Sequence, residues 1–189
     1  MANQNTTIRI KSGVVRFSYA HVFEPHAISE GAEPKYSVTL LLDKDAEDCK
    51  KTVAEINKAL KDIYEAEKSG KFKGKKFDAI RKPLRDGDEE KGDDPIYQNC
   101  WFINVSCKTA PGVIDRAGKP LDEESFYSGC YGKASFTLCP YNNAGNIGVG
   151  AFLNNILKTK DGEKLAGNVS AASDFASDLE DEDEDDELL

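Results

Sequence analysis

The chain has 189 residues, of which 39% are hydrophobic, so it can form one domain with a sizeable core but not two domains of typical size plus a tail. It contains no run of 18 apolar residues, and its N-terminus, MANQNTTIRIKSG, lacks the apolar stretch of a signal peptide. We therefore expect no membrane partner and a cytoplasmic location.

The net charge of −9 is distributed unevenly along the chain. Residues 174–189 contain ten of the 34 acidic residues and no basic one, so 24 carboxylates and 25 basic residues remain elsewhere. The main part of the chain is therefore nearly neutral, which argues against a folded acidic mimic of DNA.

Residues 8–19, IRIKSGVVRFSY, alternate between apolar and polar side chains and change phase at Gly13. This pattern predicts one long strand with a bulge or sharp bend at the glycine. The side chains expected to point inward after the bend are Val15, Phe17 and Tyr19. The cations expected on the outer face are Arg9, Lys11 and Arg16.

Residues 35–43, KYSVTLLLD, alternate again and predict a second strand, with Lys35 on its outer face. The period then changes to steps of three and four, which predicts a helix with one apolar stripe packed on a sheet. Asp43 or Asp45 is expected to cap this helix, and Gly70 to end it. The stripe consists of Cys49, Val53, Ile56, Leu60 and Ile63.

Residues 68–85 carry eight cations and one acid, Asp78, and are followed at once by the acidic stretch DGDEEKGDD. Both halves are predicted to form a long surface loop. Cations interleaved with aromatic rings suit a mobile loop that closes over unpaired bases, and a merely solvated loop is the alternative. The candidate binding residues here are Phe72, Lys73, Lys75, Lys76, Phe77, Arg81, Lys82 and Arg85.

Three further strands are predicted at residues 96–108, 129–139 and 146–158, with a short strand and turn in residues 111–120. Alternation places Trp101 in the core and Phe102 on the outer face, although a register error of one residue would bury Phe102. In the next strand, Tyr131 and Lys133 are predicted to point outward.

These elements predict a mainly β fold, a small barrel with one packed helix. Five to six antiparallel strands in Greek-key order are typical of the oligonucleotide-binding fold, and an antiparallel sandwich is the alternative. Beyond residue 165 the periodicity disappears. We therefore expect one domain at residues 1–167 and a disordered acidic tail at residues 168–189.

The predicted outer face combines cations with aromatic rings, which suits single-stranded nucleic acid because phosphates need cations and unpaired bases need flat surfaces. Duplex DNA would call for an element that fits the major groove, and no basic helix is evident. No cofactor is expected, because GKFKGKK and GNIGVGAFL do not match nucleotide-binding glycine motifs. The five cysteines form no C-x-x-C pair, so no metal site is expected.

A metal-dependent nuclease is the alternative function. It would need carboxylates that converge on one or two magnesium ions. The acids of this chain concentrate on the helix, in the loop after residue 85 and in the tail. Asp115, near a strand end, is the one carboxylate in a suitable place.

Several stretches resemble a family of bacteriophage single-stranded DNA-binding proteins over residues 8–167. The most specific are YSGCYGKAS and the segment 153–167, and FSYAHVFEP, KYSVTLLL and PGVIDRAGKPL also contribute. The resemblance implies an oligonucleotide-binding fold, a role in phage replication or recombination, and action in the bacterial host cytoplasm.

By analogy with other replication proteins, the acidic tail is expected to compete with DNA and to recruit replication or recombination proteins. The tail residues expected to meet such partners are Asp181, Glu182, Asp183, Glu184, Asp185, Asp186, Glu187, Leu188 and Leu189.

Overall fold

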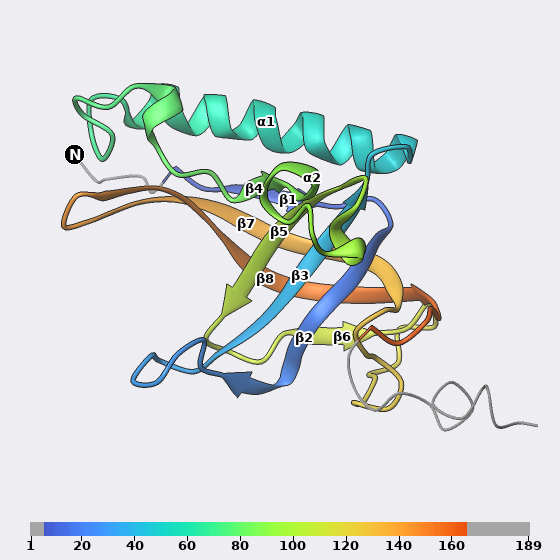
Figure 1. Ribbon diagram of the computed structural model, residues 1–189. Helices are drawn as coiled ribbons and strands as arrows, with labels where there is room; N and C mark the ends of the chain where they lie inside the picture. Colours follow the sequence, from blue (N-terminus) through green and yellow to red (C-terminus); the bar gives the residue numbers. More distant parts are fainter. Residues whose placement is uncertain (1–5, 166–189) are drawn as a thin grey trace, which may run out of the picture.

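One eight-stranded sheet forms the body of the protein, in a computed structural model that describes residues 6–165 (Figure 1). Two helices and two 3₁₀ turns accompany it. The strands are β1 (Ile8–Lys11), β2 (Val15–His26), β3 (Lys35–Asp43), β4 (Leu84–Asp86), β5 (Cys100–Cys107), β6 (Gly112–Ile114), β7 (Tyr131–Asn143) and β8 (Asn146–Lys160). The helices are α1 (Glu47–Glu67) and α2 (Gly87–Glu90), and the 3₁₀ turns are Phe77–Ala79 and Pro95–Tyr97.

The sheet closes on itself into a barrel. β2 pairs with β3, β3 with β5, β8 with β7 and β7 with β2, all antiparallel, and a parallel pairing of β5 with β8 completes the ring. Side chains that point into the ring are fully buried, among them Phe17, Leu40, Ile103 and Phe136. This arrangement confirms the predicted oligonucleotide-binding fold and excludes the sandwich. The predicted count of five to six strands is too low, because β1 and β2 were predicted as one strand and the short β4 was not predicted.

The first predicted strand is bent, as expected, and forms β1 and β2. Its glycine is required because α1 comes close: the Gly13 amide donates to Thr52 Oγ1 at 2.8 Å, and a Cβ at Gly13 would lie 2.8 Å from Asp48 Cβ. The predicted inward position of Tyr19 is wrong. A bulge between Ser18 and His21 and a φ of 47° at Tyr19 turn that ring outward, where it is 51% exposed.

Helix α1 lies across the barrel and contacts β1, β3 and β7 (Figure 1). All members of the predicted apolar stripe are buried, and each contributes roughly 1.5–3 kcal/mol of burial free energy. The predicted caps are wrong. The N-cap residue is Ala46, which makes no side-chain hydrogen bond, and the C-cap residue is Lys68 instead of Gly70. Asp48 instead accepts a hydrogen bond from the Val14 amide at 2.7 Å and so ties the helix to the bend.

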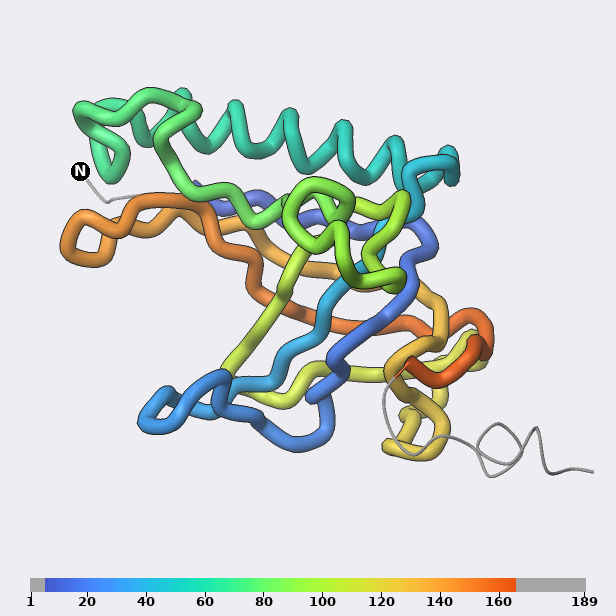
Figure 2. The backbone as a smooth tube through the Cα atoms, viewed as in Figure 1, coloured from blue at the N-terminus to red at the C-terminus, as the bar shows by residue number. Residues whose placement is uncertain are grey.

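The segment after α1 is not the long surface loop that the sequence predicts. Phe72 and Ile80 are 0% and 4% exposed, so their side chains anchor it to the core. The Arg81 amide donates to the Ile147 carbonyl at 3.0 Å, and β4 then pairs with β5. Figure 2 shows this green segment returning along the barrel beneath α1.

The acidic stretch after residue 85 is folded as well. The Asp86 carboxylate accepts from the Asp88 amide at 2.9 Å and thereby caps α2. Lys44 Nζ lies 2.7 Å from both Asp86 Oδ1 and Asp88 Oδ2. These hydrogen bonds raise the pKa of Lys44 and lower those of the two carboxyls.

The predicted boundary at residue 167 and the tail at residues 168–189 lie outside the described residues. Neither helix of the described chain is long and apolar enough to cross a membrane.

Candidate nucleic-acid interface

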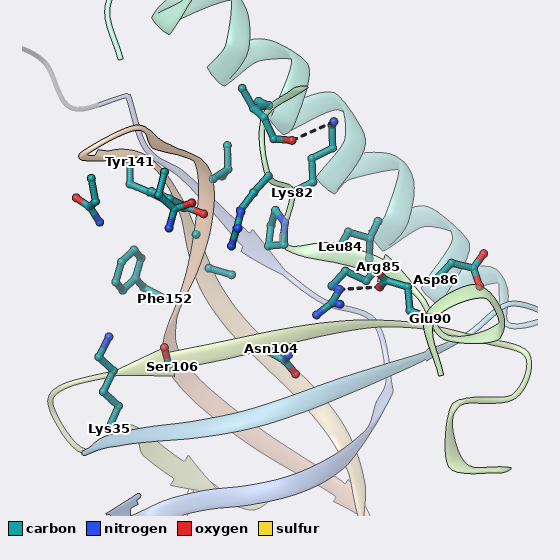
Figure 3. A pocket seen from close by; sticks show the side chains of 18 of the residues that line it. Lys35, Lys82, Leu84, Arg85, Asp86, Glu90, Asn104, Ser106, Tyr141 and Phe152 are labelled. Carbon is teal, nitrogen blue, oxygen red and sulfur yellow. Dashed lines mark hydrogen bonds and ion pairs between the residues drawn. The ribbon is translucent and has the colours of Figure 1, made fainter. Parts of the chain in front are cut away.

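A groove crosses the outer face of the barrel between the β2–β3 and β7–β8 hairpins (Figure 3). Its central part has a volume of about 920 Å³ and is lined by residues of β3, β5, β8 and the segment 80–90. A second part of about 580 Å³ shares Lys35, Ser106 and Phe152 with the first. A third part of about 430 Å³ shares Arg85, Asn104 and Ser106 with it. The three parts are therefore continuous, and we call them together the groove.

Three predicted cations reach the groove, and none of them has a carboxylate partner in the part of the chain that the structure describes. Lys35 and Arg81 line its central part, and Arg9 lines the second part. Within residues 6–165 none of these three side chains forms an ion pair. The only side-chain bond that they make there is a long one of 3.4 Å from Arg9 Nη2 to Ser135 Oγ. Their charges are thus available to an anion in the groove.

Two other predicted cations line the groove but are already engaged. Lys82 Nζ donates to the Phe77 carbonyl at 2.8 Å and lies 4.4 Å from the centroid of the Phe77 ring. Arg85 Nε donates to Glu90 Oε2 at 2.6 Å (Figure 3). A phosphate would have to displace these contacts.

Two exposed aromatic rings stand in the groove, and neither was among the predicted binding residues. Phe152 on β8 is 48% exposed and lies between the buried Ala151 and Leu153. Tyr19 is 51% exposed and lines the third part. The alternation of residues 149–153 could have revealed Phe152, whereas the bulge before His21 hides Tyr19 from any period-two pattern.

The floor between these rings is polar. Asn104 and Ser106, on β5, line the central and third parts of the groove. Thr39 Oγ1 donates to Asn104 Oδ1 at 2.7 Å, which leaves the amide NH₂ group of Asn104 as a donor. The floor can therefore meet base edges or sugar oxygens without a fixed demand for one base.

Three predicted stacking rings, Phe72, Phe77 and Phe102, pack against other aromatic side chains of the domain. Phe102 does point away from Ile103, as the alternation predicts, but it is only 1% exposed, because Tyr97 covers it edge-on at a centroid distance of 5.0 Å. Phe72 is fully buried against Tyr64, and Phe77 is half-buried with its ring edge-on to Tyr64 at 5.5 Å. The expectation of stacking is therefore wrong for Phe72 and Phe102. Phe77 keeps part of its ring exposed, and its stacking on a base stays a prediction.

Arg16 and Tyr131 lie outside the groove. Arg16 donates to the carbonyls of Gly129 and Glu163 at 3.1 and 2.9 Å. The Tyr131 ring has the Arg16 guanidinium at 5.5 Å and Lys160 Nζ at 5.4 Å from its centroid. These contacts fasten the end of β8 to the barrel, which gives both predicted residues a structural role. Lys11 and Lys133 also lie outside the three parts of the groove, on β1 and β7.

The basic turn at residues 68–76 is packed on the β7–β8 hairpin. Lys71 Nζ donates to the Pro140 carbonyl at 3.3 Å, and Asn142 Nδ2 donates to the Lys71 carbonyl at 3.1 Å. The same hairpin contributes Asn143 and Asn146 to the groove. Its exposed side chains include those of Lys73, Lys75 and Lys76, and the turn adjoins the groove through this hairpin.

Two histidines line the third part of the groove. The rings of His21 and His26 are stacked, with centroids 4.2 Å apart and planes 11° apart. Burial, and secondarily the charge of His26, lowers the pKa of His21. A proton on this pair would add positive charge to the groove.

Among residues 6–165, no three His, Cys, Asp or Glu side chains are placed to hold a metal ion. Asp115 Oδ1 accepts from the amides of Ala117 and Lys119 at 2.8 and 2.9 Å, so this carboxylate shapes a turn. The five cysteines are free thiols, and burial raises the pKa of Cys49 and of Cys100 to about 11.

Comparisons with known proteins agree with this geometry. The sequence pattern of a family described as "Enterobacter phage Enc34, ssDNA-binding protein" matches residues 8–189. Protein p50 of Acyrthosiphon pisum secondary endosymbiont phage 1 is 31% identical over 179 residues, which cover 91% of this chain and 94% of that protein.

Two solved structures have similar folds. The single-stranded DNA-binding protein of bacteriophage Enc34, in complex with single-stranded DNA, superimposes with a TM-score of 0.72 at 27% identity, covering 84% of this chain and 89% of that one. The gp2.5 single-stranded DNA-binding protein of bacteriophage T7 has a TM-score of 0.62 at 18% identity, covering 94% and 98%. The second likeness concerns the fold alone.

Proposed function

The chain belongs to the phage single-stranded DNA-binding protein family represented in Enterobacter phage Enc34, and we propose that it coats and protects unpaired DNA during phage replication or recombination in the host cytoplasm. The observation that carries the proposal is the groove, where cations that have no carboxylate partner among residues 6–165 lie beside an exposed ring on a polar floor. We propose binding without catalysis as its role.

The cations and the exposed ring of the groove suit the two components of a DNA strand, its phosphates and its bases. Lys35, Arg81 and Arg9 would hold phosphates, and every phosphate contact releases counterions and makes binding dependent on salt. Phe152 offers a flat face to a base, and stacking of this kind contributes roughly 1–3 kcal/mol per base. Every base can stack on a ring, and every nucleotide carries the same phosphate. Little sequence preference is therefore expected.

The exposed rings favour unpaired bases over duplex DNA. In a duplex the faces of the bases are stacked on each other and cannot reach Phe152 or Tyr19. The basic turn with Lys73, Lys75 and Lys76 would extend the phosphate path past the β7–β8 hairpin, and Lys11 and Lys133 would attract the strand from the neighbouring surface.

The test is a titration with labelled single-stranded DNA, duplex DNA and RNA at 50 and 200 mM salt. We expect the tightest binding to single-stranded DNA and a steep loss of affinity with salt. Equal affinity for the duplex, or no dependence on salt, would contradict the proposal.

We also propose that the acidic tail competes with DNA for the groove and recruits replication or recombination proteins. Leu165, the last described residue, packs against the small cluster of Leu41, Tyr97 and Phe102, and the two rings of that cluster line the third part of the groove. The proposal is that the carboxylates of residues 181–187, which follow this point in the chain, act as a tethered competitor, and tethering of this kind gives effective concentrations on the order of mM. DNA that displaces the tail would free it to meet basic surfaces on partners.

A further inference from the structure

The ion pair between Arg85 and Glu90 lies where two parts of the groove meet. Arg85 lines both the central and the third part, and Glu90 lines the central part. Arg85 Nε donates to Glu90 Oε2 at 2.6 Å, and the two side chains are 44% and 39% exposed. A DNA strand that follows the groove from one part into the other must pass this pair.

The position of Arg85 is fixed independently of Glu90. Arg85 pairs with Phe102 across β4 and β5, and its guanidinium carbon lies 5.2 Å from the centroid of the Phe102 ring. The buried Phe102 ring thus holds the Arg85 guanidinium in place through a cation–π interaction. The pair with Glu90 uses Nε, so the Nη groups remain as donors. The guanidinium is therefore already placed for an incoming phosphate.

Glu90 is held in place by the anchors of its short helix. Lys44 bridges Asp86 and Asp88, and Asp88 Oδ1 accepts from the Asn99 amide at 2.9 Å. The carboxylate of Glu90 is thereby presented to Arg85 before DNA arrives. Because exposed ion pairs contribute little to stability, keeping the fold is not a sufficient reason for this pair.

We propose that Glu90 is an internal competitor of DNA: its carboxylate occupies Arg85 in the free protein, and a DNA phosphate replaces it in the complex. The inference rests on the proposed function, because it assumes that a strand lies in the groove. Arg85 is then a phosphate-binding residue whose contribution is reduced by the cost of displacing Glu90. Removing the carboxylate of Glu90 would therefore increase the contribution of Arg85 to DNA affinity.

The experiment compares Glu90→Gln with Glu89→Gln. Both residues line the central part of the groove, and both substitutions remove one negative charge, but within residues 6–165 Glu89 forms no ion pair. Affinity for a labelled oligo(dT) is measured by fluorescence anisotropy over a salt series.

We expect Glu90→Gln to tighten binding roughly three- to tenfold at 50 mM salt. Its slope of log affinity against log salt should steepen by about 0.7, the value for one more phosphate contact on a single strand. Glu89→Gln should change both quantities less, because it frees no cation. Thermal unfolding of each variant checks that the fold is retained.

A double-mutant cycle identifies the cation involved. In an Arg85→Gln background, Glu90→Gln should tighten binding no more than Glu89→Gln does. Equal effects of Glu90→Gln and Glu89→Gln, or a larger gain from Glu90→Gln that persists without Arg85, would overturn the inference while leaving the proposed function intact. Failure of the unmodified protein to bind oligo(dT) would instead overturn the proposed function, and the inference with it.

Discussion

Exposure separates the roles of Phe102 and Phe152, which lie on the neighbouring strands β5 and β8. Both rings point away from the interior of the barrel, yet Phe102 is 1% exposed and Phe152 is 48% exposed. The difference is Tyr97, which folds over Phe102. One ring therefore belongs to a small satellite core, and the other is free to meet a base.

We expect Phe152→Ala to weaken DNA binding by roughly 1–3 kcal/mol with little change in salt dependence, because a base is deprived of its stacking partner while the phosphates keep theirs. Phe102→Ala should instead destabilise the fold by about 3–5 kcal/mol. Anisotropy and urea denaturation on both variants measure these effects. The assignment fails if Phe152→Ala unfolds the protein and leaves the affinity of the folded fraction unchanged.

Acid should reduce stability through His21. Its pKa is lowered in the folded state, from the ordinary value of 6.5, so the unfolded chain binds more protons just below that pH. The free energy of unfolding therefore falls as the pH drops below about 6.5. The fall ends when the pH is below the lowered pKa of His21 in the folded state. Urea midpoints at pH 7.5 and 5.5 test this, and His21→Gln should show the smaller drop. Equal drops would exclude His21 as the cause.

At the scale of elements, long periodic segments were the most predictable. The stripe of α1 and the alternation of β3, β5 and β7 identified those elements, because each repeats its pattern several times. The strand β4 spans three residues, too few for a period, and it exists through pairing with β5. The equally short β6 lies within the short strand and turn predicted at residues 111–120, and it pairs with β8. The turn after α1 looked like a free loop because the burial of Phe72 depends on contacts distant in sequence.

The same limit applies to the groove. Its cations Arg9, Lys35 and Arg81 follow from charge and alternation. The pairing of Arg85 with Glu90 and the cover of Phe102 do not, because they depend on how α2 and the Pro95–Tyr97 turn fold over β5. Sequence patterns locate charges and faces, whereas tertiary contacts decide which of them stay accessible.

The basic turn allows a test at this scale. Joint replacement of Lys73, Lys75 and Lys76 by Gln should lower the salt slope by about 0.7 for each phosphate that these lysines hold. A matched control replaces Lys50, Lys51 and Lys61, exposed cations of α1, in the same way. Salt titrations with one oligonucleotide compare the two triple variants. If their slopes are the same, the turn has no specific role.

On the scale of the whole molecule, charge is separated between a nearly neutral main part and an acidic C-terminal segment. A chain that ends at Ser173 lacks the ten carboxylates and should bind single-stranded DNA more tightly at low salt. The difference should disappear as added salt screens the tail. The shortened chain should also fail to bind a replication partner in a pull-down assay. Unchanged DNA affinity and unchanged partner binding would leave the tail as a solubility segment.

The claim that the groove binds the DNA strand is tested most directly by removing two of its cations. The variant Lys35→Gln, Arg81→Gln is compared with Lys51→Gln, Lys61→Gln, which loses the same charge from α1, in anisotropy titrations with oligo(dT) across a salt series. We predict that the groove variant loses roughly 1.4 from its salt slope, about 0.7 for each phosphate contact, and binds at least about tenfold more weakly at 50 mM salt, while the helix variant stays close to the unmodified protein. Equal losses of affinity and salt slope in the two variants, or no loss in the groove variant, would contradict the claim that the groove binds the DNA strand.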